Sequence, residues 1–244
     1  MENVRAPDPF PSEPLAKWQA AAAPVELAAL TGGAATMVVV VPHADDETLG
    51  CGGLIAAAAS AGIAVTVAIL TDGAASHPGS KVWPPARLAR RRQREARAAV
   101  TCLAGDRAAL IFIGVPDGRL AAHTGAGTAI PIADLYVTCW RGDPHPDHRA
   151  AFFIAEAAAQ KAGAPLLAFP LWVLTTPDPV PPLPLFRLNV SDQLARKRLA
   201  LTMHQSQLGG LIDDCEGFVL GDDLQRLFVR SDELFLRLAP ATPV

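Results

Sequence analysis

The sequence predicts an α/β protein whose mostly parallel central sheet is covered by helices on both faces. Short apolar runs rich in β-branched residues, such as "TMVVVV" (36–41) and "IAVTVAIL" (63–70), alternate with longer segments of helical character. Strands that are buried on both faces read as continuous apolar runs of this kind, and alternation with helices favours parallel pairing. A chain of 244 residues is long enough for one such domain with a sizeable core.

Strands and helices are expected to alternate along most of the chain from residue 36 onward, with the strands 109–114 and 133–140 following each other directly. We expect buried strands at residues 36–41, 63–70, 109–114 and 133–140. We expect helices after Glu47 and at residues 85–105, 147–163 and 190–207, the last capped by Ser191 or Asp192. Residues 1–35 are expected to be a helical or irregular lead-in, residues 36–244 a single domain, and the Pro-rich stretch 176–184 a surface loop.

Composition excludes several classes of function. A net charge of −3 with 18% charged residues does not favour nucleic acid or an anionic membrane as partner. Six arginines between Arg87 and Arg97 are interpreted as a solvated helix face. Four widely spaced cysteines and the lack of a recognisable signal peptide predict a cytoplasmic protein with reduced thiols. The uncharged stretch 48–71 is interpreted as a buried helix and strand, with no membrane span.

Two polar clusters directly follow predicted strands. "PHADDE" comes after residues 36–41, and "RGDPHPDH" comes after residues 133–140. In open α/β sheets, ligands bind beyond the carboxyl ends of the strands, so both clusters are expected at one edge of the sheet. Three adjacent acids at the end of an apolar run are costly without a positive partner.

Imidazole and carboxylate groups with matched spacing suggest that this partner is a metal ion. His43 and Asp46 are three residues apart, as are His145 and His148. Both residue types ligate zinc, and three protein ligands with one open position are typical of catalytic zinc sites. Either His145 or His148 completes the set, and the other stabilises an oxyanion or protonates a leaving amine.

Two further carboxylates have expected roles beside the metal. Asp45 is the candidate general base that deprotonates water, and Asp147 is placed to fix a histidine tautomer. Two alternatives remain open for these motifs. Two histidines and a carboxylate also match the iron(II) oxygenase triad. "LGCGG" (49–53) hints at a dinucleotide-binding turn, but it lacks the G-x-G-x-x-G spacing.

Taken together, "PHADDETLGCGG" and "HPDH" resemble the LmbE-like/PIG-L family of zinc-dependent deacetylases. The resemblance extends through "LTDG", an R-x-x-E pair (Arg92 and Glu95), "GVPDG" and "KRLALTMHQSQ", and so covers about residues 36–220. It implies a Rossmann-like three-layer α/β/α fold. Members act on N-acetylglucosaminyl phosphatidylinositol, on mycothiol and bacillithiol precursors and on glycopeptide antibiotics.

The resemblance implies a role for each matching residue. It implies His43, Asp46 and His148 as metal ligands, for Zn2+ or alternatively Fe2+. It implies Asp45 as general base, and His145, oriented by Asp147, as the group facing the oxyanion. Arg92 and Asp117 match substrate-contacting positions, although Arg92 could equally belong to the solvated arginine face. Ala44 stands where the family usually has proline, which removes no functional group.

The expected activity is therefore that of a zinc-dependent N-deacetylase, a hydrolase of linear amides other than peptides. A metal-activated water and an Asp general base would remove an acetyl group from an N-acetylated amino sugar, such as N-acetylglucosamine, or its conjugate. The alternatives are an amidase for a larger acyl group or a thiol conjugate, and a non-catalytic metal- or sugar-binding protein. His77 and His123 are expected to be solvated loop residues, and His204 a helix cap or a site-lining residue. Oligomeric state is left open.

Overall fold

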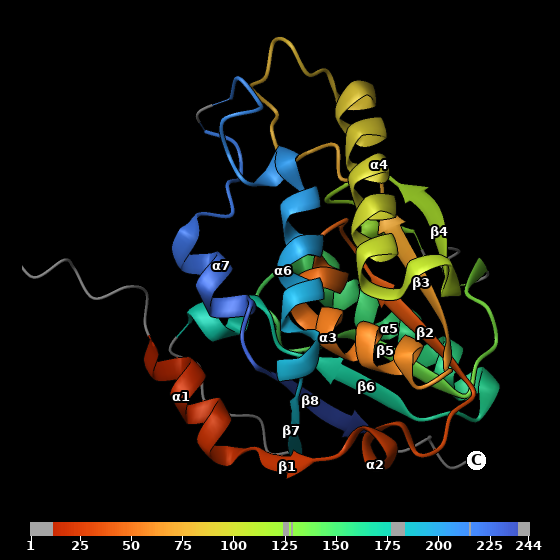
Figure 1. Cartoon of the computed structure of the whole chain (residues 1–244). Coiled ribbons are helices and arrows are strands. Elements are labelled where there is room, and N and C mark those ends of the chain that lie inside the picture. The colour runs from red at the N-terminus through yellow and green to blue at the C-terminus, as the bar shows by residue number, and fades with distance from the viewer. Residues whose placement is uncertain (1–11, 124–126, 128, 177–183, 215, 239–244) are drawn as a thin grey trace, which may run out of the picture.

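One mixed sheet forms the centre of the computed structural model, which describes residues 12–123, 127, 129–176, 184–214 and 216–238 (Figure 1). The strand order is β1-β7-β8-β6-β5-β2-β3-β4. Strand β8 is antiparallel to β6 and β7, and the other neighbouring strands are parallel. The strand bounds are β1 Ala23–Val25, β2 Thr36–Val41, β3 Ala64–Thr71, β4 Ala108–Val115, β5 Leu135–Cys139, β6 Leu166–Phe169, β7 Leu185–Asn189 and β8 Asp232–Leu238. The predicted fold class is confirmed.

Helices cover both faces of this sheet. They are α1 Ser12–Ala21, α2 Leu27–Thr31, α3 Asp46–Ser60, α4 Pro85–Ala104, α5 Pro146–Ala162, α6 Leu194–Met203 and α7 Asp222–Phe228. The connection β2-α3-β3 runs in one direction across the sheet, and β5-α5-β6 runs in the other. Because such crossovers are right-handed, α3 and α5 lie on opposite faces. Helices α3, α4 and α6 pack against one another in front of the sheet in Figure 1.

Predicted strands and helices from residue 36 onward lie within a few residues of the observed ones, with one difference at α6. A 3-10 turn, Ser191–Gln193, precedes α6, and no side chain caps the helix. The predicted cap at Ser191 or Asp192 is therefore wrong. The Pro-rich stretch 176–184 falls almost entirely outside the described residues.

The N-terminal segment is more closely integrated than a lead-in. Strand β1 extends the sheet beside β7, and Trp18 of α1 is fully buried in the core. A three-residue strand is too short to show a periodic pattern in the sequence. Its pairing partner lies about 160 residues away in the chain, so no neighbouring residues indicate the pairing either. The described part of this segment shares the core of residues 36–238.

Helix α3 contains the sequence "LGCGG" and is broken at Cys51, whose φ and ψ are −144° and 23°. A Cβ atom on Gly50 would lie 2.1 Å from the ring of Phe169, and one on Gly53 would lie 2.6 Å from Val190. These glycines therefore allow close packing of the helix, and they do not form a phosphate-binding turn. Within the described residues, no helix is long and apolar enough to cross a membrane.

Candidate active site and metal centre

The polar clusters meet at the carboxyl ends of β2 and β5, which are neighbours in the centre of the sheet. The connection from β2 leads to β3 on one side, and that from β5 leads to β6 on the other, so the chain diverges here. Loops that diverge in this way leave a crevice between them. A pocket of about 350 Å³ lies there. Its lining includes His43, Asp45, Asp46, Arg92, Asp117, His145, Trp172, Gln207 and Phe218.

Asp46 bridges two of the predicted metal ligands. Its Oδ2 lies 3.2 Å from Nδ1 of His43, and its Oδ1 lies 3.4 Å from Nε2 of His148. The backbone amide of His43 also donates to Oδ2 of Asp46, at 3.0 Å. The three predicted ligands are therefore adjacent, with His148 and Asp46 buried and His43 facing the pocket.

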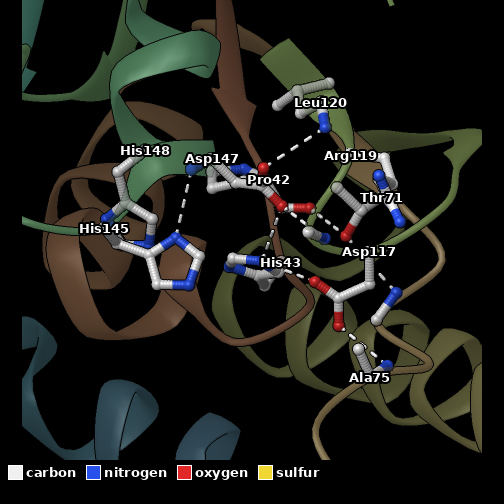
Figure 2. Close-up of polar contacts among 12 residues, drawn as sticks. Pro42, His43, Thr71, Ala75, Asp117, Arg119, Leu120, His145, Asp147 and His148 are labelled. Carbon is white, nitrogen blue, oxygen red and sulfur yellow. Dashed lines mark hydrogen bonds and ion pairs between the residues drawn. The ribbon is translucent and has the colours of Figure 1, made fainter. Parts of the chain in front are cut away.

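Two acidic side chains contact the opposite nitrogen of His43. Oδ1 of Asp117 lies 3.1 Å from Nε2 of His43, and Oδ2 of Asp147 lies 3.6 Å from it (Figure 2). The second oxygen of Asp117 accepts a hydrogen bond from the amide of Ala75. Carboxylates that hold the second nitrogen of a ligating histidine fix its ring orientation and raise its basicity. Asp117 thus both lines the pocket and supports His43.

Asp143 supports His148 in the same way, and sequence reasoning did not single it out. Its Oδ1 lies 3.3 Å from Nδ1 of His148 and accepts from the amide of His145, while Oδ2 accepts from the amide of Trp172. Asp143 is fully buried. Its only signal in the sequence is its place in "RGDPHPDH", five residues before His148.

The donor set fits a divalent cation. Ring nitrogens of His43, His145 and His148 lie within 4.8 Å of one another. So do a carboxylate oxygen of Asp46, the sulfur of Cys139 and a ring nitrogen of His148. Both ring nitrogens of the buried His148 lack a well-formed hydrogen bond. Burial disfavours the charged form of Asp46, but His148 and His43 outweigh it and hold the pKa of Asp46 well below its usual value. Imidazole and ionised carboxylate are the ligands that zinc and iron accept.

Asp45 adopts a backbone conformation that side chains rarely tolerate. Its φ is 147°, and it is the one residue other than glycine with positive φ in the described chain. Such a conformation costs about 1–3 kcal/mol and is found mainly at functional sites. Burial raises the pKa of Asp45 to about 6, although the guanidinium of Arg92, whose Nη2 lies 3.3 Å from Oδ1, opposes the rise. A buried carboxylate with a pKa near neutrality is suited to proton transfer.

His145 is held by the backbone of Asp147, while the Asp147 carboxylate faces His43. The amide of Asp147 donates to Nδ1 of His145, at 3.2 Å (Figure 2). The carboxylate of Asp147 also accepts from the amides of Gly118 and Leu120. Burial and the neighbouring His43 and His148 lower the pKa of His145. Because Nδ1 accepts, a neutral His145 carries its proton on Nε2.

Arg92 differs from the other five arginines of α4. It is 3% exposed and lines the pocket. Besides contacting Asp45, it donates to the carbonyl oxygens of Ala44 and Gly73. The interpretation of Arg92 as part of a solvated face is therefore wrong, because α4 packs this one position against the loops after β2 and β3.

Of the remaining histidines, two are buried. His77 is 4% exposed, and its Nδ1 lies 3.0 Å from Oγ of Ser76, so the expectation that it is solvated is wrong. His123 is exposed, as expected. His204 is absent from the lining of the pocket and occupies the C-cap position of α6, as one of its two expected roles predicts. Its Nε2 lies 3.2 Å from both Oγ1 of Thr48 and Oε1 of Glu47.

Gln207 was not recognised from sequence, although it lies at the end of "HQSQ". It is fully buried and lines the pocket, and its Oε1 has no hydrogen-bond partner among the residues that the structure describes. Oγ of Ser206 donates to Glu95 and therefore accepts from Nε2 of Gln207. Glu95 is held in turn by Arg91 at 2.6 Å. This chain of hydrogen bonds fixes the amide so that Oε1 remains a free acceptor.

Comparison with protein families gives one match. Residues 38–159, which include the whole of both polar clusters and α4, match the PIG-L family, described as GlcNAc-PI de-N-acetylase. No curated protein sequence matches the chain.

Several solved structures share the fold. N,N'-diacetylchitobiose deacetylase from Pyrococcus horikoshii is 16% identical, with a TM-score of 0.60 and coverage of 98% of this chain and 95% of its own. The A40926 pseudoaglycone deacetylase Dbv21 is 22% identical, with a TM-score of 0.65 and coverage of 86% and 99%. GalB, the 4-carboxy-2-hydroxymuconate hydratase of Pseudomonas putida KT2440, is 19% identical, with a TM-score of 0.55 and coverage of 86% and 98%. The same fold therefore carries different reactions.

Proposed function

Since the chain belongs to the PIG-L family, whose profile spans half of it, we propose that it is a metal-dependent N-deacetylase of an N-acetylated amino sugar or its conjugate. One observation carries the proposal beyond family membership. Asp45, a strained and buried carboxylate, faces the same pocket as the cluster of histidines and carboxylates. That combination supplies a proton acceptor beside a cation site, which hydrolysis of an unactivated amide requires.

His43, Asp46 and His148 are the proposed ligands of Zn2+, with Fe2+ as an alternative. A divalent cation held there supplies Lewis acidity, which polarises a carbonyl and makes water more acidic. Asp117 and Asp143 hold the second nitrogens of His43 and His148, so both rings are oriented before a cation arrives.

Asp45 transfers the proton, and His145 stabilises the negative charge that develops on the carbonyl oxygen. Asp45 accepts a proton from the water that adds to the acetamide carbonyl carbon. Nε2 of the neutral His145 donates a hydrogen bond to the carbonyl oxygen as that oxygen becomes negative. Asp45 then returns its proton to the nitrogen, the carbon–nitrogen bond breaks, and acetic acid and a free amine are formed, which become acetate and an ammonium ion by proton exchange.

The pocket favours a compact polar substrate. Its volume of about 350 Å³ lies near the lower end of the usual range for small-molecule sites. Arg92 and Asp117 offer a donor and an acceptor, and the rings of Trp172 and Phe218 form an apolar wall. One acetamido sugar ring suits these groups better than a long acyl chain, which is the substrate of the alternative amidase.

The proposal is tested by release of acetate from metal-loaded protein. N-acetylglucosamine and N,N'-diacetylchitobiose are suitable first substrates. Asp45→Asn is expected to keep its metal and to lose at least about 100-fold in turnover, because the proton acceptor is removed. Asp106→Asn, at an exposed turn, is the matched control and should keep full turnover. Equal turnover of Asp45→Asn and wild type would overturn the mechanism. Wild-type protein that holds metal but releases no acetate from any N-acetylated sugar would favour the non-catalytic alternative.

A further inference from the structure

The thiol of Cys139 lies next to the proposed metal ligands, on the side that faces the protein interior. The sulfur of Cys139 and donor atoms of Asp46 and His148 lie within 4.8 Å of one another. Cys139 and His148 are fully buried, and Asp46 is 2% exposed. This inner donor set of Asp46, Cys139 and His148 shares two members with the proposed ligands and lies deeper than His43, which faces the pocket.

The sheet itself places the thiol there. Cys139 is the last residue of β5, and the residue before it, Thr138, lies opposite Val40 of β2. The loop after β2 carries Asp46, and the loop after β5 leads to His148 at the start of α5. Cys139 is therefore held between the two ligand-bearing loops by strand pairing, and it needs no movement of the backbone to reach them.

A second observation points to a ligand between these groups. Among the described residues, neither ring nitrogen of the buried His148 makes a well-formed hydrogen bond: Asp143 lies 3.3 Å from Nδ1, and Asp46 lies 3.4 Å from Nε2. Buried polar atoms without partners are uncommon in folded proteins and call for a ligand or ion.

We propose that Cys139 is a fourth protein donor to the metal site, where the reacting water would then be a fifth ligand, and that it makes the site select thiophilic cations over cations that prefer oxygen. Thiolate ligands favour Zn2+ and related soft ions, whereas carboxylate and water suit Mg2+ and Mn2+. When the sulfur–metal bond forms, the thiol proton leaves to solvent and no electron is transferred. The inference rests on the proposed function only in requiring that a cation binds at this cluster.

Absorption spectroscopy of the Co2+-loaded protein tests the sulfur contact directly. Thiolate ligation of Co2+ gives an intense charge-transfer band in the near ultraviolet, beside the weaker visible bands that any bound Co2+ shows. Wild type is expected to show both. Cys139→Ala should lose the near-ultraviolet band and keep the visible bands. Cys102→Ala, which changes a half-buried thiol on α4, is the matched control and should keep both.

Metal competition gives a second measurement. Replacing Cys139 by Ala should weaken Cd2+ binding about tenfold or more relative to Mn2+ binding, because only the soft cation loses a preferred donor. Equal weakening of both cations would overturn the selectivity.

X-ray absorption of zinc-loaded wild type keeps the inference testable if Cys139→Ala does not fold. It should show one sulfur neighbour at about 2.3 Å from zinc. Bound metal with only nitrogen and oxygen neighbours would overturn the role of Cys139 and leave the proposed function intact. No bound Co2+ or zinc in wild type would overturn both.

Discussion

Gln207 lines the pocket with an amide group whose orientation is fixed by its neighbours. Its amide is oriented by Ser206, which is itself fixed by donation to Glu95. Oε1 therefore remains an acceptor at the wall of the pocket, and no other side chain or backbone group in the described part of the chain donates to it. A substrate hydroxyl or amide N–H would satisfy it, so Gln207 is expected to contact substrate.

Replacing Gln207 by Met should remove this acceptor at nearly constant volume. KM is expected to rise about 2- to 10-fold, the equivalent of one neutral hydrogen bond, with little change in kcat. The measurement is steady-state acetate release against concentration of the best substrate.

Gln205→Met provides the control for that substitution. Gln205 is an exposed neighbour that accepts from Arg91 and does not line the pocket, so its KM should stay at the wild-type value. An unchanged KM in Gln207→Met would mean that substrate does not use this acceptor.

At the scale of elements, the break in α3 shows how a buried ion pair supports the site. Nζ of Lys197 donates to the carbonyl oxygen of Leu49, at the end of the first half of the helix. The carboxylate of Glu233 accepts from the amides of Gly53 and Leu54, at the start of the second half. Lys197 and Glu233 also contact each other at 2.6 Å. Together they satisfy the backbone groups that the break exposes, and the first half of α3 carries Asp46.

Removing either Lys197 or Glu233 alone should lower the stability of the folded protein. Lys197→Met leaves the Glu233 carboxylate buried without its cation and is expected to lower the free energy of unfolding by about 3–5 kcal/mol. Adding Glu233→Gln should recover part of the loss, because no isolated charge then remains. Urea unfolding of wild type, the single variants and the double variant measures the coupling.

Lys17→Met is the matched comparison, since Lys17 pairs with Glu13 on the exposed surface of α1. Its free energy of unfolding should equal that of wild type within error. Strict additivity of Lys197→Met and Glu233→Gln would show that the pair does not act as a unit.

For the whole molecule, the proposed metal links the two halves of the sheet. His43 and Asp46 follow β2, while His148 follows β5, and without a cation the buried acids around them depend on histidines for compensation. Burial disfavours a charged His43, but Asp117, Asp147 and Asp46 outweigh it and raise the pKa of His43 well above its usual value. A cation bound to the native state alone stabilises that state.

Metal removal should therefore lower thermal stability. At free metal a hundredfold above Kd the stabilisation is about 2.7 kcal/mol, which for a chain of this size corresponds to roughly 5–10 °C in Tm. Calorimetry of zinc-loaded protein before and after treatment with a chelator measures the shift. The His43→Ala/His148→Ala variant should show no shift, and an identical response in both proteins would place any metal elsewhere.

Much of this architecture follows from the sequence alone. The apolar runs at 36–41 and 133–140 fix two central strands, because fully buried parallel strands tolerate few polar residues. Polar clusters directly after those runs predict one shared site at the carboxyl edge of the sheet, and the residue types predict metal ligation. These are local patterns, so they can be recognised without knowing the fold.

Only the tertiary structure decided the surroundings of these residues. The burial of Arg92 among five exposed or half-buried arginines depends on how α4 packs against the loops after β2 and β3. Asp143 contacts Trp172, and Cys139 lies near Asp46, so both depend on segments that are distant in the chain. The amide of Gln207 is oriented by Ser206, which is itself held by Glu95. Strand β1 is at the edge of the sheet and depends on pairing with β7. Such contacts leave no periodic pattern in the sequence, because they depend on how distant segments pack together. Strands and helices do leave such a pattern, because they are determined largely by residues that are close in sequence.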